Sequence, residues 1–462
     1  MSMQMKWFYE GPHRSLGSFV VRAALLCVAA GAGSACGSES STESGDATDA
    51  VSDTTGLATD ATSATDSSAA GDSVASGDTT TPQFKAMCSD TQPCGSGKMC
   101  ASGVCTVEPK PDQVAEVTDP NNDYLPTKDK VELGCVDQSF QDQIKGETGP
   151  STVTMWGRVD RFGGGAVTVN VEVAVFELEK FHPEVCVGID DDDKRDACLL
   201  SDKVGKPIGT TVSVDPDKAA ASGLDVQSAK KAGEGCSKHL DCPSGYECRK
   251  ESGAVQKICI RTHGVYAIDN VPTNTRLVVR VRGLNVKDKW HVGYYWDIVL
   301  FAGHIDVKGA GKQPAKLVGK DTYRVNPTIV GEGQWTLVPN TLGVGEIDYP
   351  HGVIGGRIRD CGVTGGRGGW AIHNAKVGLG VQPKGFAYFN DNEDDTVPVK
   401  TNTATDTLGR FAAVDLPPGA NRISATSWVD GKATSLGGVD VFVIPDALMI
   451  VSLPGRIPVL SK

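Results

Sequence analysis

The sequence lacks the motifs that mark the commonest acyl-transfer and phosphoryl-transfer enzymes. It has no Gly-x-Ser-x-Gly elbow for a serine nucleophile and no Gly-x4-Gly-Lys-Ser/Thr loop for a phosphate group. The apolar run near its start, Ala23 to Ala35, covers about thirteen residues, too few to cross a bilayer as a stable helix. These absences argue against enzymes of those two classes. The shortness of the apolar run favours a removed signal over a membrane-spanning anchor at the N-terminus.

Basic residues are also absent from a long stretch near the N-terminus. Between Gly37 and Phe84 the chain has nine Asp and Glu residues and no Lys or Arg. Large apolar side chains are rare there, so folding would not offset the loss of chain entropy. We expect a disordered acidic tether, with an average end-to-end distance of about 35–40 Å for a flexible coil. The chain carries a net charge of −12, which argues against nucleic acid as a partner.

Cys36 stands between the apolar run and this tether. Basic residues, a short apolar core, small residues and a cysteine follow one another in that order. The order resembles a bacterial lipoprotein export signal. The resemblance implies that residues 1–35 are removed and that Cys36 is acylated. Residues 36–84 would then form the lipid anchor and tether.

The residues around the cysteine add detail to this resemblance. Cys36 is followed by Gly37 and Ser38, and neither residue is Asp. In the lipoprotein family, the lack of Asp after the cysteine implies passage to the outer membrane, on its periplasmic or cell-surface face. The family prefers Leu where this chain has Gly33. The alternative is an ordinary secretory signal cleaved near Ala35.

Twelve of the fourteen cysteines lie beyond Cys36, an even number that favours disulfides in an exported protein. Two short segments, residues 85–107 and 236–259, repeat the frame Cys-Ser-x4-Cys-x-Ser-Gly-x2-Cys and then close on a fourth cysteine. The eight cysteines are Cys88, Cys94, Cys100, Cys105, Cys236, Cys242, Cys248 and Cys259. Segments this short cannot bury a core, so we expect two disulfides in each module, with the connectivity inside each module open. Structural zinc is the alternative, although Cys-x2-Cys knuckles are absent.

Four further cysteines remain. Cys186 and Cys198 flank the acidic loop at residues 190–193, where a local bridge is natural. Cys135 and Cys361 are then left to each other. We expect their bond to join the start of one β domain to the start of the next.

From residue 150 onward the chain reads as β-strands separated by turns. Residues 166–178 alternate apolar and polar side chains almost strictly, and residues 292–301 are rich in β-branched and aromatic side chains. No amphipathic helix of convincing length appears. The pattern predicts an all-β protein with two Greek-key β-sandwiches, at residues 150–335 and 350–462, after a linker at 108–149. The second cysteine module is an insertion in the first sandwich.

A motif in the second sandwich supports this class. Residues 405–421 contain Thr-Asp, then Gly-x-Phe, then Leu-Pro-x-Gly. The order resembles carboxypeptidase regulatory-like domains, which are transthyretin-like β-sandwiches. The resemblance covers about residues 350–455, and a weaker copy spans about 150–330. The zinc peptidases that accompany such domains use His-x2-Glu, and none of the eight histidines has Glu three residues on.

Two acidic loops, at residues 190–193 and 390–395, offer the oxygen ligands that calcium prefers. The second fits better. Its candidate ligands are Asp391, Glu393, Asp394 and Asp395. Neither loop has EF-hand spacing, and a solvated loop is the alternative for each.

An aromatic cluster occupies residues 290–296. In a strand, Trp290, Tyr294 and Trp296 share one face and Tyr295 takes the other. An exposed row of this kind would stack on sugar rings or on a partner protein, whereas a buried row would belong to the core.

The sequence thus predicts a non-enzymatic cell-envelope lipoprotein with a structural, binding or adhesive role. We expect no cofactor other than calcium. The expected partners are the membrane, through the lipid, and an envelope protein or glycan, but not nucleic acid. The alternative is a carbohydrate-binding module that uses Trp290, Tyr294 and Trp296.

Overall fold

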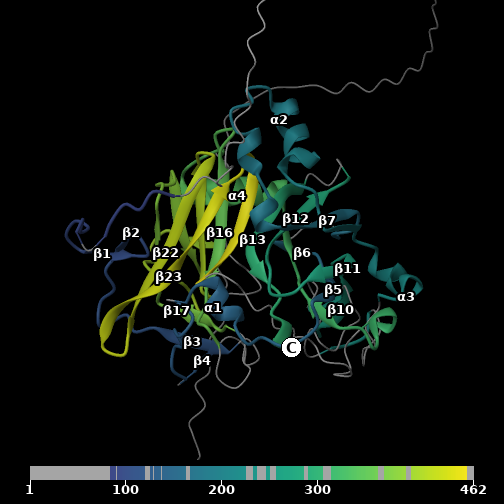
Figure 1. The fold of residues 1–462 in the computed structure, drawn as a ribbon, viewed down its shortest axis with the longest axis horizontal. Helices are drawn as coiled ribbons and strands as arrows, with labels where there is room; N and C mark the ends of the chain where they lie inside the picture. Colours follow the sequence, from purple (N-terminus) through teal and green to yellow (C-terminus); the bar gives the residue numbers. More distant parts are fainter. Residues whose placement is uncertain are drawn as a thin grey trace, which may run out of the picture. The chain divides into compact units, whose positions relative to one another are not determined.

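The computed structural model describes residues 84–454, except residues 90, 120–124, 128, 137, 163–166, 225–232, 237–245, 250–255, 286–289, 305–313, 363–368 and 392–396. Within these residues the fold is all-β, with strands in six sheets and only short helices (Figure 1). All of them belong to one compact unit of the chain. The expected signal, Cys36 and nearly all of the tether lie outside the described residues.

One sheet of eleven strands runs through both expected sandwiches. Its path is β20 (Pro398–Val399), β19 (Gly385–Phe389), β21 (Arg410–Leu416), β16 (Gly352–Ile358), β24 (Ala447–Leu453), β13 (Trp290–Val299), β12 (Arg276–Gly283), β7 (Val171–Glu177) and β8 (Gly209–Val212). β15 (Thr328–Gly331) pairs with β13, and β6 (Asp160–Phe162) pairs with β15. β24 lies parallel to β13 on one side and to β16 on the other. The two halves therefore share a sheet, which the sequence did not predict.

Each half adds a second layer to this sheet. In the first half, β11 (Val265–Pro272), β5 (Thr152–Arg158) and β14 (Thr322–Arg324) share a core with β7 and β12. In the second half, β18 (Lys376–Leu379), β22 (Gly419–Val429) and β23 (Lys432–Val443) share a core with β16, β21 and β24. A further small sheet contains β17 (Ala371–His373), β3 (Glu116–Asp119) and β4 (Leu125–Pro126). Two layers in each half give the predicted sandwich-like architecture.

The middle of the central sheet is buried on both faces, as β12 shows. Leu277 and Val279 point into the core shared with β5, and Val278 points into the other core. That second face is covered by residues 178–204, whose Phe181 and Leu199 join the same cluster as Val278. The covering segment consists of η1 (Leu178–Lys180), η2 (Pro183–Cys186), α2 (Asp192–Leu199) and η3 (Asp202–Val204).

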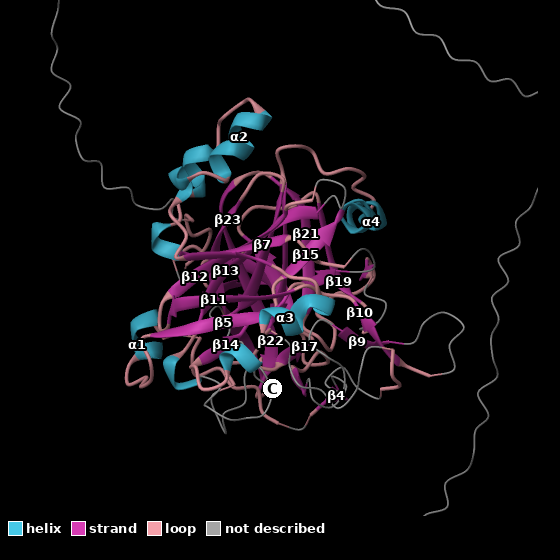
Figure 2. Ribbon diagram, turned by 90° about the vertical axis from the view of Figure 1, so that its right-hand side faces the viewer, coloured by secondary structure: helices cyan, strands magenta, loops and turns pink. Residues whose placement is uncertain are grey.

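The helices are short and lie at the periphery of the strands (Figure 2). Besides those above, they are α1 (Phe140–Ile144), η4 (Pro216–Lys218), α3 (Ala219–Ser222), η7 (Ala302–His304), η8 (Ala315–Leu317) and α4 (Glu332–Leu342). α4 ends at Gly343, whose φ of 72° is the left-handed value that closes many helices. Among the described residues, no helix is both long enough and apolar enough to cross a membrane.

Each cysteine module contains one β-hairpin. The first is formed by β1 (Lys98–Ala101) and β2 (Val104–Val107), and the second by β9 (Tyr246–Arg249) and β10 (Ile258–Arg261). The two hairpins bury different faces. The first buries Ala101 and Val104 and leaves its cysteines partly exposed, whereas the second buries Cys248 and Cys259. The repeated unit is therefore packed on the body in two different ways.

Candidate functional site

The described cysteines are all in disulfides. The five bonds between described residues are Cys88–Cys100, Cys94–Cys105, Cys135–Cys361, Cys186–Cys198 and Cys236–Cys248. Cys259 is disulfide-bonded as well, and Cys242 lies outside the described residues. The pairs Cys135–Cys361 and Cys186–Cys198 are the ones that the sequence predicts. The first bond of each module joins cysteines twelve positions apart. The two modules therefore share this disulfide as well as their cysteine spacing.

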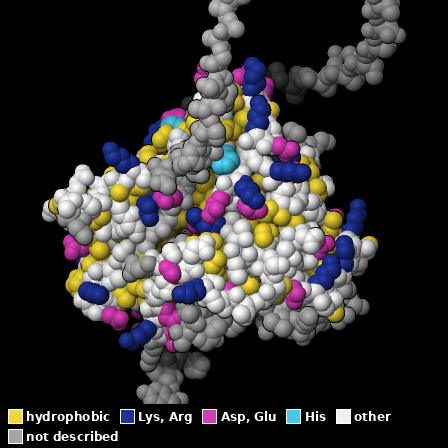
Figure 3. Space-filling model, in the orientation of Figure 1, with side chains coloured by type: hydrophobic (Ala, Val, Ile, Leu, Met, Phe, Trp, Pro, Cys, Tyr) yellow, Lys and Arg dark blue, Asp and Glu magenta, His cyan; other side chains and the backbone are white. Residues whose placement is uncertain are grey.

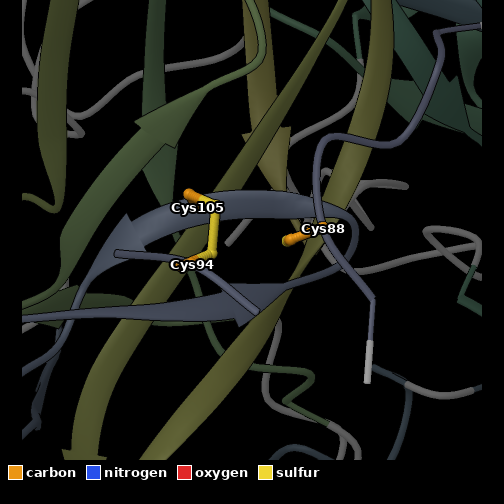
Figure 4. A group of neighbouring side chains, drawn as sticks. All are labelled: Cys88, Cys94 and Cys105. Carbon is orange, nitrogen blue, oxygen red and sulfur yellow. A yellow bond between two sulfur atoms is a disulfide. The ribbon is translucent and has the colours of Figure 1, made fainter. Parts of the chain in front are cut away.

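The first module also tests the zinc alternative. The sulfur atoms of Cys88, Cys94 and Cys105 lie within 4.8 Å of one another, as three metal ligands would. Figure 4 shows the bond between Cys94 and Cys105, and Cys88 is bonded to Cys100. A sulfur in a disulfide carries no thiolate and does not ligate zinc. Disulfides of this number place the protein in an oxidising, extracytoplasmic compartment.

The aromatic cluster is largely core. Tyr294 is 1% exposed and Trp296 is 5% exposed, and both rings pack against Phe181. Trp290 does not share their face, because it lies opposite Gly331 of β15 and packs against the core of the first half. The expected row is thus divided between two cores. No flat aromatic surface remains at these residues for a sugar ring to stack on, and the carbohydrate alternative loses its site.

The first acidic loop caps a helix. Asp191 is the N-cap of α2 and accepts a hydrogen bond from the Lys194 amide. Its pKa is lowered by the hydrogen bonds from Lys194. Asp192 pairs with Arg195 at 2.6 Å. The loop predicted at residues 190–193 is wrong in its second half, because Asp192 and Asp193 form the first turn of α2. The structure uses Asp191 for capping and Asp192 for ion pairing.

The second acidic loop begins at the edge of a polar groove of about 250 Å³. Asp391, Asn402 and His373 line this groove. The Asp391 carboxylate accepts a hydrogen bond from the Thr407 amide at 2.8 Å. Glu393, Asp394 and Asp395 lie outside the described residues. Calcium at this loop stays a prediction.

A second polar cluster is formed by Asp415, His351, Asp348 and Lys384. β21 has a bulge where it pairs with β16, because Gly352 lies opposite Leu416 while Ile354 lies opposite Ala413. Asp415 sits in this bulge with a φ of 61°, a conformation that Asp and Asn tolerate better than most residues. His351 directly precedes β16 and Lys384 directly precedes β19, the two strands that flank β21. The three side chains therefore meet at one end of three adjacent strands.

The geometry of this cluster is tight. Oδ1 of Asp415 accepts hydrogen bonds from His351 Nδ1 and from the Asp348 amide, each at 2.8 Å. Lys384 Nζ lies 3.1 Å from Asp348 Oδ2 and 3.3 Å from Asp415 Oδ2. The Asp415 side chain is 1% exposed, whereas that of Lys384 is 49% exposed. A nearly buried carboxylate is thus held between a histidine and a flexible ammonium group.

Electrostatics keeps Asp415 ionised. Burial alone would raise the pKa of Asp415, but hydrogen bonds from the Asp348 amide and His351, together with the nearby Lys384 ammonium, outweigh it and lower the pKa. The same two carboxylates raise the pKa of Lys384. The cluster therefore carries two negative charges and one positive charge around neutral pH, apart from any charge on His351.

Sequence reasoning did not find this cluster. His351 and Asp415 are 64 residues apart, and no spacing rule relates them. The usable signals were local. Asp415 precedes Leu-Pro-Pro-Gly, a turn sequence, and Tyr349-Pro350 precedes a strand.

Comparisons with known proteins add little to this geometry. Neither the protein-family models nor the curated proteins give a match. Among solved structures, the chain is similar to shaft pilin SpaA from Lactobacillus rhamnosus GG, with 9% identity, 67% of this chain and 100% of that chain covered, and a TM-score of 0.15. It is also similar to a minor pilin from Streptococcus agalactiae, with 9% identity, 68% and 98% covered, and a TM-score of 0.14.

A leucine-rich repeat protein from Bacteroides thetaiotaomicron is similar over 67% of this chain at 8% identity and a TM-score of 0.15. This chain covers only 27% of that protein. TM-scores this low do not establish a common fold, so nothing about these proteins is transferred here.

Proposed function

We propose that this chain is a non-enzymatic cell-envelope lipoprotein, anchored through Cys36, with a structural, binding or adhesive role. The order of its segments supports the anchor, because a signal-like run, a cysteine and an acidic tether precede the folded part. The disulfides support export, since such bonds persist in oxidising compartments. In the outer membrane the tether would hold the folded body away from the lipid surface.

The pairing of the cysteines carries this proposal. Eleven described cysteines are disulfide-bonded, so none of them is left as a thiol. The predicted pattern of two bonds in each module pairs Cys259 with Cys242, and Cys36 would then have no partner beyond the signal. An unpaired cysteine directly after a signal-like run fits a lipid attachment site.

The folded body supports a binding or structural role. Its second half fits the regulatory-like resemblance: Gly409 has a φ of 69° just before β21, and Pro417-Pro418 forms the turn from β21 to β22. Lys, Arg, Asp and Glu side chains are interspersed on the face drawn in Figure 3. A surface of mixed charge suits a protein partner better than a polyanion.

Labelling with an alkyne-tagged fatty acid in a lipoprotein-processing bacterium tests the anchor. We expect the wild-type chain to be labelled and to fractionate with the outer membrane. Cys36→Ser should lose both the label and the membrane association, and Cys27→Ser, the matched control within the signal, should keep both. Gly33→Leu, which restores the residue preferred by the lipoprotein family, should increase labelling.

Two results would overturn the anchor. One is a label that persists in Cys36→Ser. The other is a labelled fraction of zero in both the wild-type chain and Gly33→Leu, with a soluble protein that begins near Cys36.

A further inference from the structure

We propose that Asp415, His351 and Asp348 form a site for a divalent transition-metal cation, which Zn²⁺ probes, and that Lys384 holds this site closed when the metal is absent. One ligand atom from each of the three residues lies within 4.8 Å of the other two. Two carboxylates and an imidazole form a ligand set that zinc and related cations accept, with a remaining position open to water.

A buried oxygen supplies the second, independent sign of a ligand. Oδ2 of Asp415 is buried and makes no hydrogen bond of good geometry within the described part of the chain. The Lys384 ammonium lies 3.3 Å away and provides charge without a hydrogen bond of good geometry. This oxygen is thus held by an ion pair in place of a well-formed hydrogen bond, and a metal cation that binds it directly would replace that ion pair.

Charge also favours the exchange. With Lys384 in place, two carboxylates face one ammonium, which balances only one of their two negative charges. A dication in place of the ammonium would neutralise both carboxylates. Lys384 is half exposed and is attached through a flexible chain, so it can turn into solvent without disturbing the core.

The imidazole must change its tautomer when the metal binds. His351 Nδ1 now faces Asp415 Oδ1 at 2.8 Å, as an N–H donor would. To ligate a metal through Nδ1, the ring must carry its proton on Nε2 instead. The ring is 30% exposed, so it can exchange this proton with water. The bound metal would then clamp residues 348–351, which connect the two halves, to the end of β21.

Calorimetric titration of the purified exported chain with Zn²⁺ tests this site. We expect binding of one Zn²⁺ per chain. Asp415→Asn should weaken it at least tenfold, and its backbone tolerates Asn at the same positive φ. His351→Gln should have a similar effect. His182→Gln, at the separate His182–Glu184 pair, should leave binding unchanged.

The Lys384→Met variant distinguishes a metal site from an ion-pair network that binds no metal. Removing the competing ammonium should tighten Zn²⁺ binding about tenfold. It should also lower the melting temperature without metal and restore it when Zn²⁺ is added. The proposal fails if neither the wild-type chain nor Lys384→Met binds one equivalent, or if binding is the same in Asp415→Asn. The role of the anchor at Cys36 is independent of either outcome.

Discussion

Buried tyrosines give the protein a built-in response to alkaline pH. Tyr266 and Tyr294 are each 1% exposed, and Tyr388 is 6% exposed. Burial raises the pKa of Tyr294, Tyr295 and Tyr388 to about 12, and that of Tyr266 well above its usual value. The hydrogen bond from Tyr266 to the Val325 carbonyl also favours its neutral phenol, because only the protonated form can donate.

This arrangement predicts cooperative unfolding at alkaline pH. Below the usual phenol pKa of about 10 the tyrosines are protonated in both states, and stability is unaffected. As the pH rises from about 10 to about 12, the unfolded chain loses protons that the folded chain keeps. Each such tyrosine then lowers the free energy of unfolding by about 1.4 kcal/mol per pH unit.

The measurement is phenolate absorbance recorded together with circular dichroism during a pH titration. We expect phenolate from these tyrosines to appear only as the β-sheet signal is lost. Tyr388→Phe should shift the midpoint to higher pH, because it removes one of the linked protons. Phenolate that forms fully before any loss of sheet would contradict the prediction.

The aromatic cluster shows what sequence reasoning misses at the scale of single residues. Alternation in β13 correctly separates Tyr295 from Tyr294 and Trp296. It fails for Trp290, because there β13 changes its partner from β12 to β15. A strand with different neighbours along its length does not present one uniform face, and the sequence carries no sign of that change.

At the scale of elements, the first cysteine module packs on the second sandwich, and β2 of the module comes very close to Gly378 of β18. Thr106 of β2 hydrogen-bonds Ser424 of β22, and Thr426 donates to the Val107 carbonyl at 2.8 Å. A Cβ atom on Gly378 would lie 2.4 Å from Thr106 Oγ1. The module can sit this close only because that strand position has no side chain.

Gly378→Ala should therefore loosen the module without unfolding the sandwich. We expect faster hydrogen exchange in residues 98–107 and easier proteolysis near residue 108, because the new methyl group pushes Thr106 away. The cost should be about 1–3 kcal/mol, typical of overpacking. Gly95→Ala is the matched control, since a Cβ there meets nothing within 4 Å.

Unchanged exchange in the module of Gly378→Ala would show that the contact is not needed for docking. Equal effects from Gly378→Ala and Gly95→Ala would also contradict the prediction, because only the first substitution introduces a clash.

The elements that the sequence predicts well are those whose determinants are local. Repeated cysteine spacing predicts both modules. The bond between Cys135 and Cys361 is predicted because they are the last two cysteines once the others are paired. Alternation predicts β7. The parallel pairing of β24 with β13 depends instead on contacts between residues about 150 positions apart, such as Met449 with Tyr294. The bulge that creates the Asp415 cluster could not be predicted from the sequence either, because it depends on the register between β16 and β21.

At the scale of the whole molecule, Cys135–Cys361 is expected to stabilise the protein more than a local bond does. It joins residues 226 positions apart, whereas Cys186–Cys198 spans 12 positions. Loop-closure entropy assigns about 5 kcal/mol to the long loop and about 3 kcal/mol to the short one. We expect that order when each pair is replaced by Ala and unfolding is followed in denaturant without reductant. The reverse order would contradict it.

The shared sheet predicts that the two halves unfold together. β24 lies between β13 and β16, so losing it would expose the edges of both halves at once. Calorimetry should therefore show one transition for residues 84–454. Met449→Ala, at a fully buried position of β24, should cost about 2–5 kcal/mol and accelerate hydrogen exchange in β5 and β22 alike. Val212→Ala, on an edge strand at 40% exposure, is the control and should change neither. Two calorimetric transitions, or faster exchange in only one half, would mean that the sheet is continuous in geometry but not in its unfolding.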